Sequence, residues 1–388
     1  MKNRKIVSFI LIIQIIFSIQ INNSRDIQIE PILKENKENI KPYTDYNIEY
    51  ATIPFWKNTI MYNESIMFVG KESIAPLLYT LTEIISITSY DGTIIYIPGV
   101  DYVIKNGNIY LTSQTRIPFF TIEEYYPTVR DSTTLDCSNP NHPYLKFSEG
   151  NYFQSRQVLV TYYHNDHDGN DIQESYYNKF VKFFQKVKNG QNPTILFYGD
   201  SITVGANASG FLNQKPYTPI WPKMVHSFLE KKFGEKINYV NTAVGGTNSQ
   251  WGVEHFTENV INYKPDFLVL AFGMNDNINK EAFKNNIYKM IEAIKIANND
   301  IKILLVSTTL PNKEALGFNA FQGTYEMALY ELTKAFSYIG LARMTSIHNF
   351  LLKKKRFYDM TGNNVNHPND FLTRIYCHTV LKALLDDY

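Results

Sequence analysis

The spacing of apolar and polar positions divides the chain into two regions. In the first half, short runs rich in apolar and β-branched residues, such as 84–88 and 93–97, are separated by turn residues. The pair Asp91-Gly92 stands between these two runs, and Asp-Gly between β-rich runs favours a tight hairpin. Residues 158–163 have the composition of one more strand, and no long helical period is visible. We therefore predict an all-β accessory domain, a sandwich or jelly roll, over residues 49–170.

After about residue 175 the spacing becomes helical and then alternates between buried strands and helices. Phe180, Phe183, Phe184 and Val187 stand at i, i+3, i+4 and i+7, which predicts an amphipathic helix. Strands are expected at 194–198, 237–240, 267–272, 303–306 and 339–342, and helices at 282–297, 325–336 and 371–385. This alternation predicts an α/β domain over residues 175–388, with a parallel sheet covered by helices on both faces.

The first residues have the pattern of an export signal. Three basic residues within the first five precede an apolar stretch at 6–19, which is too short to span a bilayer comfortably. We predict a signal peptide over residues 1–24, with an uncleaved anchor as the alternative, and a polar linker over residues 25–48. A secreted or cell-surface protein follows from this pattern, and no further membrane span is expected.

Charge and cysteine content narrow the function classes. The 388 residues carry a net charge of +1, so nothing favours a nucleic-acid partner. Cys137 and Cys377 allow at most one disulfide, and we expect two unpaired thiols, with a single bridge as the alternative. Asn63-Glu64-Ser65 and Asn207-Ala208-Ser209 match the glycosylation acceptor pattern, although a glycan on the second would lie close to the candidate site described next. The sequence gives no indication of the oligomeric state.

Four short motifs follow expected strands or precede the last expected helix. In a parallel sheet, ligands bind at the carboxyl ends of the strands, so these motifs should meet at one edge. The motifs are Gly199-Asp200-Ser201, the segment from Asn241 to Thr247, Gly273-Met274-Asn275-Asp276, and Asn366-His367-Pro368-Asn369.

With these motifs in this order, residues 190–385 resemble the SGNH (GDSL-type) hydrolase family. The resemblance implies a flavodoxin-like three-layer α/β/α domain and ester hydrolysis that needs no metal or cofactor. Ser201 matches the nucleophile of the family, and His367 matches its histidine. Gly246 and Asn275 match the glycine and the asparagine of its second and third sequence blocks.

The chemistry of these residue types agrees with the resemblance. A serine hydroxyl is a weak nucleophile until a base takes its proton, and histidine, with an ordinary pKa of about 6.5, suits that task. The oxyanion of a tetrahedral intermediate needs preorganised donors. The N–H groups of Ser201 and Gly246 and the side-chain amide of Asn275 are the candidates. We therefore predict Ser201 as the nucleophile and His367 as its base.

One position departs from the family pattern. The family usually has an aspartate three residues before the histidine, and this chain has Asn364 there. An amide can hold the imidazole tautomer, but it carries no charge to stabilise imidazolium. The candidates for a third member are Asn364, which would leave a Ser-His dyad, and the carboxylates of Asp370 and Asp359. An inactive protein is the remaining alternative.

Export, a β-rich leading domain and an aromatic content of 14% together favour a carbohydrate O-acetylesterase. The leading domain also looks similar to the jelly-roll modules that precede SGNH domains in some plant-cell-wall esterases. The expected partner is an acylated polysaccharide or small molecule. A short-chain lipase or thioesterase is the second hypothesis. A catalytically inactive carbohydrate-binding surface protein is the third.

Overall fold

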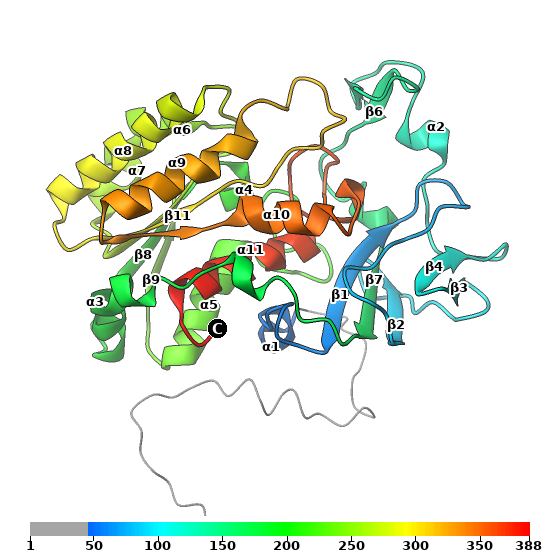
Figure 1. Ribbon diagram of the computed structural model, residues 1–388, viewed down its shortest axis with the longest axis horizontal. Coiled ribbons are helices and arrows are strands. Elements are labelled where there is room, and N and C mark those ends of the chain that lie inside the picture. The colour runs from blue at the N-terminus through cyan, green and yellow to red at the C-terminus, as the bar shows by residue number, and fades with distance from the viewer. Residues whose placement is uncertain (1–45) are drawn as a thin grey trace, which may run out of the picture.

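The computed structural model describes residues 46–388 (Figure 1). The predicted signal peptide at 1–24 lies outside the described residues, as does nearly all of the predicted linker at 25–48. Among residues 46–388, no helix combines the length and the apolar character needed to cross a bilayer. Cys137 and Cys377 are both free thiols, which confirms the prediction of two unpaired cysteines.

Five parallel strands form the centre of the C-terminal part, in the order β12-β11-β10-β8-β9. Their bounds are β8 (Thr194–Gly199), β9 (Asn238–Asn241), β10 (Phe267–Ala271), β11 (Lys302–Val306) and β12 (Ile339–Ala342). The three inner strands are almost wholly buried, as expected for strands covered on both faces. In chain order the sheet reads 2-1-3-4-5, which is the flavodoxin-like arrangement and confirms the predicted α/β fold.

Helices cover both faces of this sheet (Figure 1). One layer contains α6 (Ser249–Glu254), α7 (Phe256–Asn259), α8 (Lys280–Ala297) and α9 (Gln322–Ala335), and the other contains α3 (Tyr177–Lys188), α5 (Trp221–Phe233) and α11 (Asp370–Leu384). The remaining helices are α1 (Ile48–Ala51), α2 (Ile122–Tyr125), α4 (Ser201–Val204) and α10 (Met344–Leu352), with short 3-10 turns η3 (Gln154–Arg156), η4 (Asn170–Ile172), η5 (Ile261–Tyr263) and η6 (Phe357–Asp359). Helix α8 begins two residues before the predicted 282–297 because Asn279 caps it by accepting from the N–H of Ala282.

The leading part is β-rich and antiparallel, as predicted, but smaller than a sandwich or jelly roll. Its strands form a three-stranded sheet in the order β1-β7-β2 and two separate hairpins, β3–β4 and β5–β6. The bounds are β1 (Ile60–Met67), β2 (Glu83–Ser89), β3 (Tyr102–Lys105), β4 (Asn108–Leu111), β5 (Thr134–Asp136), β6 (Tyr144–Lys146) and β7 (Gln157–Tyr163). The predicted run 93–97 turns back on β2 but pairs with it only through an isolated bridge between Thr88 and Ile95.

The small sheet packs against the α/β part instead of against a second sheet. Strand β1 contacts η6 and α11, and Arg374 of α11 donates to the carbonyl of Tyr62 at 2.8 Å. One cluster of buried apolar side chains runs through both parts. The α/β part therefore supplies the covering layer that the second sheet of a sandwich would otherwise provide.

A buried ion pair also joins the two parts. The carboxylate of Glu64 in β1 meets the ammonium of Lys355, which follows α10, and both side chains are fully buried. Glu64 also accepts from the N–H of Leu78 at 2.8 Å and from the hydroxyl of Tyr162 at 2.6 Å. The charge is thus paired and hydrogen-bonded, which is the condition for burying it without a large penalty.

Candidate active site

Ser201 lies where β8 ends and α4 begins, at the carboxyl edge of the sheet. Asp200 caps the turn by accepting from the N–H of Ile202 at 3.0 Å. The indole N–H of Trp221 donates to the carbonyl of Ile202 at 3.0 Å from the other side. The side chains of Asp200 and Trp221 therefore hold the backbone at Ile202, directly after Ser201.

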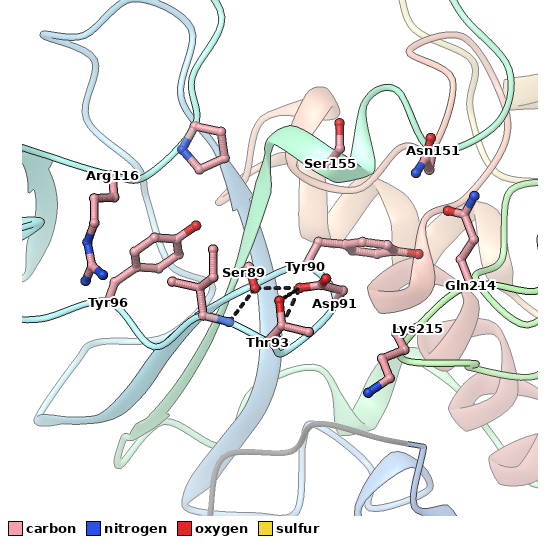
Figure 2. A pocket seen from close by; sticks show the side chains of 12 residues that line it. Ser89, Tyr90, Asp91, Thr93, Tyr96, Arg116, Asn151, Ser155, Gln214 and Lys215 are labelled. Carbon is pink, nitrogen blue, oxygen red and sulfur yellow. Dashed lines mark hydrogen bonds between the residues drawn. The ribbon is translucent and has the colours of Figure 1, made fainter.

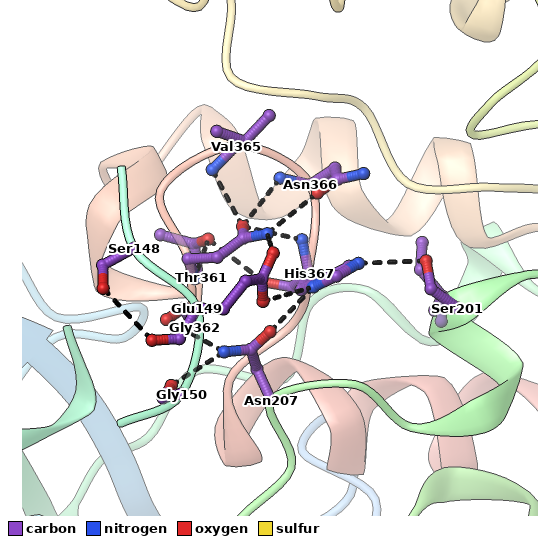
Figure 3. A network of polar contacts seen from close by, with 12 residues as sticks. Ser148, Glu149, Gly150, Ser201, Asn207, Thr361, Gly362, Val365, Asn366 and His367 are labelled. Atoms are coloured by element: carbon purple, nitrogen blue, oxygen red, sulfur yellow. Dashed lines mark hydrogen bonds and ion pairs between the residues drawn. The ribbon is translucent and has the colours of Figure 1, made fainter. Parts of the chain in front are cut away.

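His367 lies in the loop between η6 and α11, and a neighbouring asparagine shapes that loop. The side-chain oxygen of Asn363 accepts from the N–H groups of Val365, Asn366 and His367, each at 3.0 Å. In this conformation the Nε2 atom of His367 lies 2.9 Å from the Oγ of Ser201 (Figure 3). The structure thus brings together the predicted nucleophile and base, which are far apart along the chain.

Two acceptors hold the opposite nitrogen of the same ring. The Nδ1 atom of His367 lies 2.7 Å from the Oδ1 of Asn207 and 3.1 Å from the Oε2 of Glu149 (Figure 3). The amide orientation of Asn207 is set because its Nδ2 donates to the carbonyl of Gly150 at 2.8 Å. Both groups facing Nδ1 can only accept, so Nδ1 carries the proton and Nε2 is free to accept from Ser201.

Asn207 is also the asparagine of Asn207-Ala208-Ser209, one of the two segments that match the glycosylation pattern. Its side chain points into the site, and the residue is only 2% exposed. The asparagine of the other pattern, Asn63, is 7% exposed and hydrogen-bonds Thr161. Both side chains are therefore engaged inside the fold.

Asn364, the residue at the family position of the third member, is directed elsewhere. Its Oδ1 accepts from the hydroxyl of Tyr125 and its Nδ2 donates to the carbonyl of Lys146, both at 2.9 Å. The backbone of Asn364 has a φ of +67°, a left-handed conformation that asparagine tolerates better than most residues. Asn364 therefore joins the active-site loop to the leading part, and the structure does not bring it to the imidazole.

The two predicted carboxylates are also bound elsewhere. Asp370 accepts from the N–H of Ser209 at 2.8 Å and from the hydroxyl of Tyr90 at 3.4 Å. Asp359 accepts from the N–H of Met67 at 2.8 Å and pairs with Arg356 at 2.9 Å. Each carboxylate is committed to holding the leading part against the α/β part, so neither takes the place expected of a third member.

Glu149 and Asp200, two carboxyl groups near the Ser201–His367 pair, have pKa values shifted in opposite directions. Burial alone would raise the pKa of Glu149, but the hydrogen bond and charge of His367, with hydrogen bonds from Asn363 and Asn207, lower that pKa below its ordinary value. Burial, together with the charge of Asp276, raises the pKa of Asp200 to about 7. Near neutral pH the carboxylate that touches the imidazole is therefore ionised.

Two of the predicted oxyanion donors, Gly246 and Asn275, lie on the loops that follow β9 and β10, the strands on either side of β8. One N–H of the Asn275 amide donates to the carbonyl of Thr247 at 2.9 Å, and an amide nitrogen carries a second N–H. Gly246 has a φ of +76°, and a Cβ there would meet nothing within 4 Å, so the backbone conformation and not lack of space requires glycine. A Cβ at Gly245 would lie 3.8 Å from that of Ser201, which shows how closely this loop passes the nucleophile.

A cavity of about 600 Å³ opens between the leading part and the segment that follows Asn207. Figure 2 shows Tyr90, Asp91 and Thr93, from the turn after β2, near Gln214 and Lys215. The rest of its wall is formed by Ser89, Ile94, Tyr96, Arg116, Pro118, Asn151 and Ser155.

Within residues 46–388, no group of three histidine, cysteine, aspartate or glutamate side chains is arranged to hold a metal ion.

No curated protein matches the chain, but solved structures of two esterases are similar to it. A two-domain esterase active on acetylated mannans, crystallised with mannopentaose, is similar in structure, with 21% identity over 56% of this chain and 55% of that one, and a TM-score of 0.46. The chain thus spans about half the length of that esterase. A variant of an acetylxylan esterase from Geobacillus stearothermophilus is similar with 18% identity over 49% of this chain and 93% of the other, and a TM-score of 0.42.

The sequence itself matches a family model, the GDSL-like lipase/acylhydrolase family, over residues 197–371. The matched segment begins within β8 and ends at the start of α11, so it contains Ser201, Asn275 and His367. Glu149 lies outside it. Residues 197–371 of this chain are therefore a GDSL-like lipase/acylhydrolase domain, which confirms the SGNH resemblance predicted from the sequence.

Proposed function

We propose that this protein is a serine carboxylic ester hydrolase that acts through an acyl-enzyme on Ser201. The observation that carries the proposal is the 2.9 Å contact between the Nε2 of His367 and the Oγ of Ser201, with the proton of the ring held on Nδ1. This arrangement gives the hydroxyl an acceptor for its proton, which is what activates a serine nucleophile. The family match of residues 197–371 supports the same reaction class.

In the proposed cycle, the Oγ of Ser201 forms a bond to the acyl carbon while its proton passes to the Nε2 of His367. The carbonyl oxygen becomes an oxyanion, for which the N–H groups of Ser201 and Gly246 and the second amide N–H of Asn275 are the proposed donors. The ester C–O bond then breaks, and the alcohol leaves with the proton from Nε2. Water attacks the acyl-enzyme by the same route in reverse, which releases the acid and restores the serine hydroxyl.

We further propose that the alcohol part of the substrate is a carbohydrate. The cavity of about 600 Å³ supports this, because hydroxyl, amide and charged groups from both parts of the chain line it together with tyrosine side chains. Ser201 and His367 are not among the residues that line the cavity, but Asn151 follows Glu149 by two residues and Gln214 follows Asn207 by seven. A polyhydroxylated ligand fits a site with many convergent hydrogen-bonding groups better than a plain hydrocarbon chain does.

A short-chain lipase or thioesterase is the second candidate, and exposed apolar side chains near the site favour it. Val244 precedes the two glycines beside Ser201 and is 39% exposed. Phe321 is 43% exposed and precedes Gln322, whose amide donates to the carbonyl of Met274 next to Asn275. Secretion or cell-surface display stays a prediction from the sequence, because the predicted signal peptide at 1–24 lies outside the described residues.

Labelling with a fluorophosphonate tests the reaction class, because only an activated serine reacts. We expect labelling of the full-length protein and none of its Ser201→Ala variant, and an unlabelled wild-type protein would contradict the proposal.

Acetate release from acetylated xylan and glucomannan, compared with a chain-length series of p-nitrophenyl esters, tests the substrate class. Strong turnover of the polysaccharides, with a sharp loss beyond short acyl groups, is the expected result. A preference for longer acyl chains would favour the second candidate.

A further inference from the structure

We infer that two residues divide the work of the missing aspartate: Asn207 holds the tautomer of His367, and Glu149, from the leading β-rich part, supplies the negative charge. The inference rests on the proposed function and deepens it. The observation is that the Nδ1 atom of His367 faces a neutral acceptor at 2.7 Å and a carboxylate at 3.1 Å. No residue of the matched family segment supplies that carboxylate, because Glu149 precedes residue 197.

Asn207 is suited to fix the ring because it is itself fixed. The residue is 2% exposed, and its Nδ2 donates to the carbonyls of Gly150 at 2.8 Å and Gly362 at 3.4 Å. The side-chain amide of Gln154 donates to its backbone carbonyl. These contacts keep its Oδ1 pointed at Nδ1, so a neutral side chain maintains the productive tautomer without help from a charge.

Glu149 is tied to the same loop as the base. The Nδ2 of Asn363 donates to the Oε1 of Glu149 at 3.0 Å, and the Oδ1 of Asn363 accepts from the N–H of His367 at 3.0 Å. One asparagine therefore sets the carboxylate and the imidazole relative to each other. The lowered pKa of Glu149 keeps it ionised where the enzyme would work.

The role of Glu149 is electrostatic positioning. When Ser201 transfers its proton to Nε2, the ring becomes imidazolium, and a carboxylate at 3.1 Å from Nδ1 stabilises that charge. Within residues 46–388, the carboxyl group of Asp200, directly after β8, also has a charge interaction with His367. The leading part would thereby complete the active site, with no need to contact the reacting ester.

Glu149→Gln tests the inference, because it removes the charge and keeps the shape. With p-nitrophenyl acetate we expect kcat to fall about 10–10²-fold with little change in KM. The loss is smaller than the roughly 10⁴-fold of an Asp-to-Asn change in a trypsin-type triad, because Asn207 still holds the tautomer. The acid limb of kcat/KM should also move to lower pH, since imidazolium forms less readily without the anion. Repeating the profile in an Asp200→Asn background separates this movement from titration of Asp200.

Two variants serve as controls and one as rescue. Glu72→Gln, at an exposed position of the leading part, should match wild type in rate and pH profile. Glu149→Asp retains a charge at a longer distance and should keep the acid limb near its wild-type position with an intermediate rate. Adding Asn207→Asp to Glu149→Gln returns a carboxylate to Nδ1 and should restore part of the rate and move the acid limb back.

Two outcomes would overturn the inference. The first is a Glu149→Gln enzyme with wild-type rate and profile. The second is a slower enzyme whose acid limb does not move, because that pattern belongs to a purely structural residue. Fluorophosphonate labelling of Ser201 in the same preparations keeps this test separate from the proposed function. A labelled protein with an unchanged profile rejects only the role of Glu149, whereas an unlabelled wild-type protein rejects the hydrolase itself.

Discussion

The α/β part and the β-rich part of this protein contribute to the same site in different ways. In the α/β part, five parallel strands are paired in regular register and end at one edge, where Ser201 follows β8 and the Asn275 loop follows β10. In the β-rich part, a three-stranded sheet and two hairpins leave long connecting segments, and Glu149 lies on one of these, between β6 and η3. The sheet therefore sets where the chemistry happens, and a loop of the smaller part adjusts its electrostatics.

The two carboxylates near the Ser-His pair show the same difference. Asp200 belongs to the sheet edge, where burial raises its pKa to about 7. Glu149 belongs to the connecting loop, where its side chain is 53% exposed and its pKa is lowered by the groups around His367. A buried scaffold position is thus a costly place for a charge, and an exposed loop can bring an ionised carboxylate to the imidazole at less cost in desolvation.

The largest expected effect on stability comes from the ion pair that joins the two parts. Lys355→Met should leave the buried carboxylate of Glu64 without its cation and lower the free energy of unfolding by about 3–5 kcal/mol. Chemical denaturation measures the change, and Lys353→Met, at an exposed position two residues away, should stay within about 0.5 kcal/mol of wild type.

The shape of the same unfolding curve is also informative. Because one apolar cluster runs through both parts, Lys355→Met should shift a single transition to lower denaturant concentration. A separate early transition of the β-rich part would show that the two parts fold independently, and the picture of a leading part locked onto the scaffold would then fail. Combining Lys355→Met with Glu64→Gln should cost less than the sum of the two single changes, since both charges are then removed.

The next largest expected effect is on the reaction rate and concerns the α/β part of the site. Asn275→Ala removes the proposed oxyanion donor and should lower kcat about 10²–10³-fold with a smaller change in KM, because the interaction forms in the transition state. The matched control is Asn277→Ala, an exposed asparagine in the same loop, which should retain most of the activity. Equal losses in both variants would point to a disturbed loop and would remove Asn275 from the list of oxyanion donors.

The sequence predicted the α/β part well because its signals are local. Buried strands and amphipathic helices have periodic patterns, and the predicted strand at 339–342 coincides with β12. Ser201 and His367 could be predicted because both stand in short motifs at places where a parallel sheet gathers its ligands. The β-rich part was less predictable, since the partner of its sheet is a set of helices distant in sequence. Nothing in the run 93–97 indicates that it will pair with β2 only through an isolated bridge.

The acceptors of the imidazole could not be predicted for a related reason. Glu149 stands in Ser148-Glu149-Gly150, which reads as an ordinary polar turn, and it meets His367 only after the two parts have packed. In the sequence, the only feature that marks Asn207 is the glycosylation pattern Asn207-Ala208-Ser209. Asn364 stands at the family position, yet its left-handed backbone and its bonds to Tyr125 and Lys146 turn it away from the ring. Sequence spacing does not encode such a change of direction.

The smallest expected effect tests the contrast between the two carboxylates. With an ordinary pKa of 3.8 and a value of about 7 in the folded protein, Asp200 keeps a proton in the native state that it loses in the unfolded state. Its presence therefore lowers stability progressively as pH rises from about 4 to 7, and the penalty is complete above that range. Asp200→Asn keeps a good helix cap and has no proton to lose. Its melting temperature relative to wild type should therefore rise by a few degrees across this interval.

Glu149→Gln should show the opposite sign in the same measurement. The pKa of Glu149 is lowered on folding, so its contribution to stability is present above its ordinary value and is lost as pH falls through the folded value. The variant should thus be the less stable protein near neutral pH, and the difference should shrink below about pH 4.5, the ordinary value for glutamate. If the stability of both variants differed from that of wild type in the same direction as pH rises, Asp200 and Glu149 would affect stability alike. The distinction between a costly buried charge and a stabilised exposed one would then have to be given up.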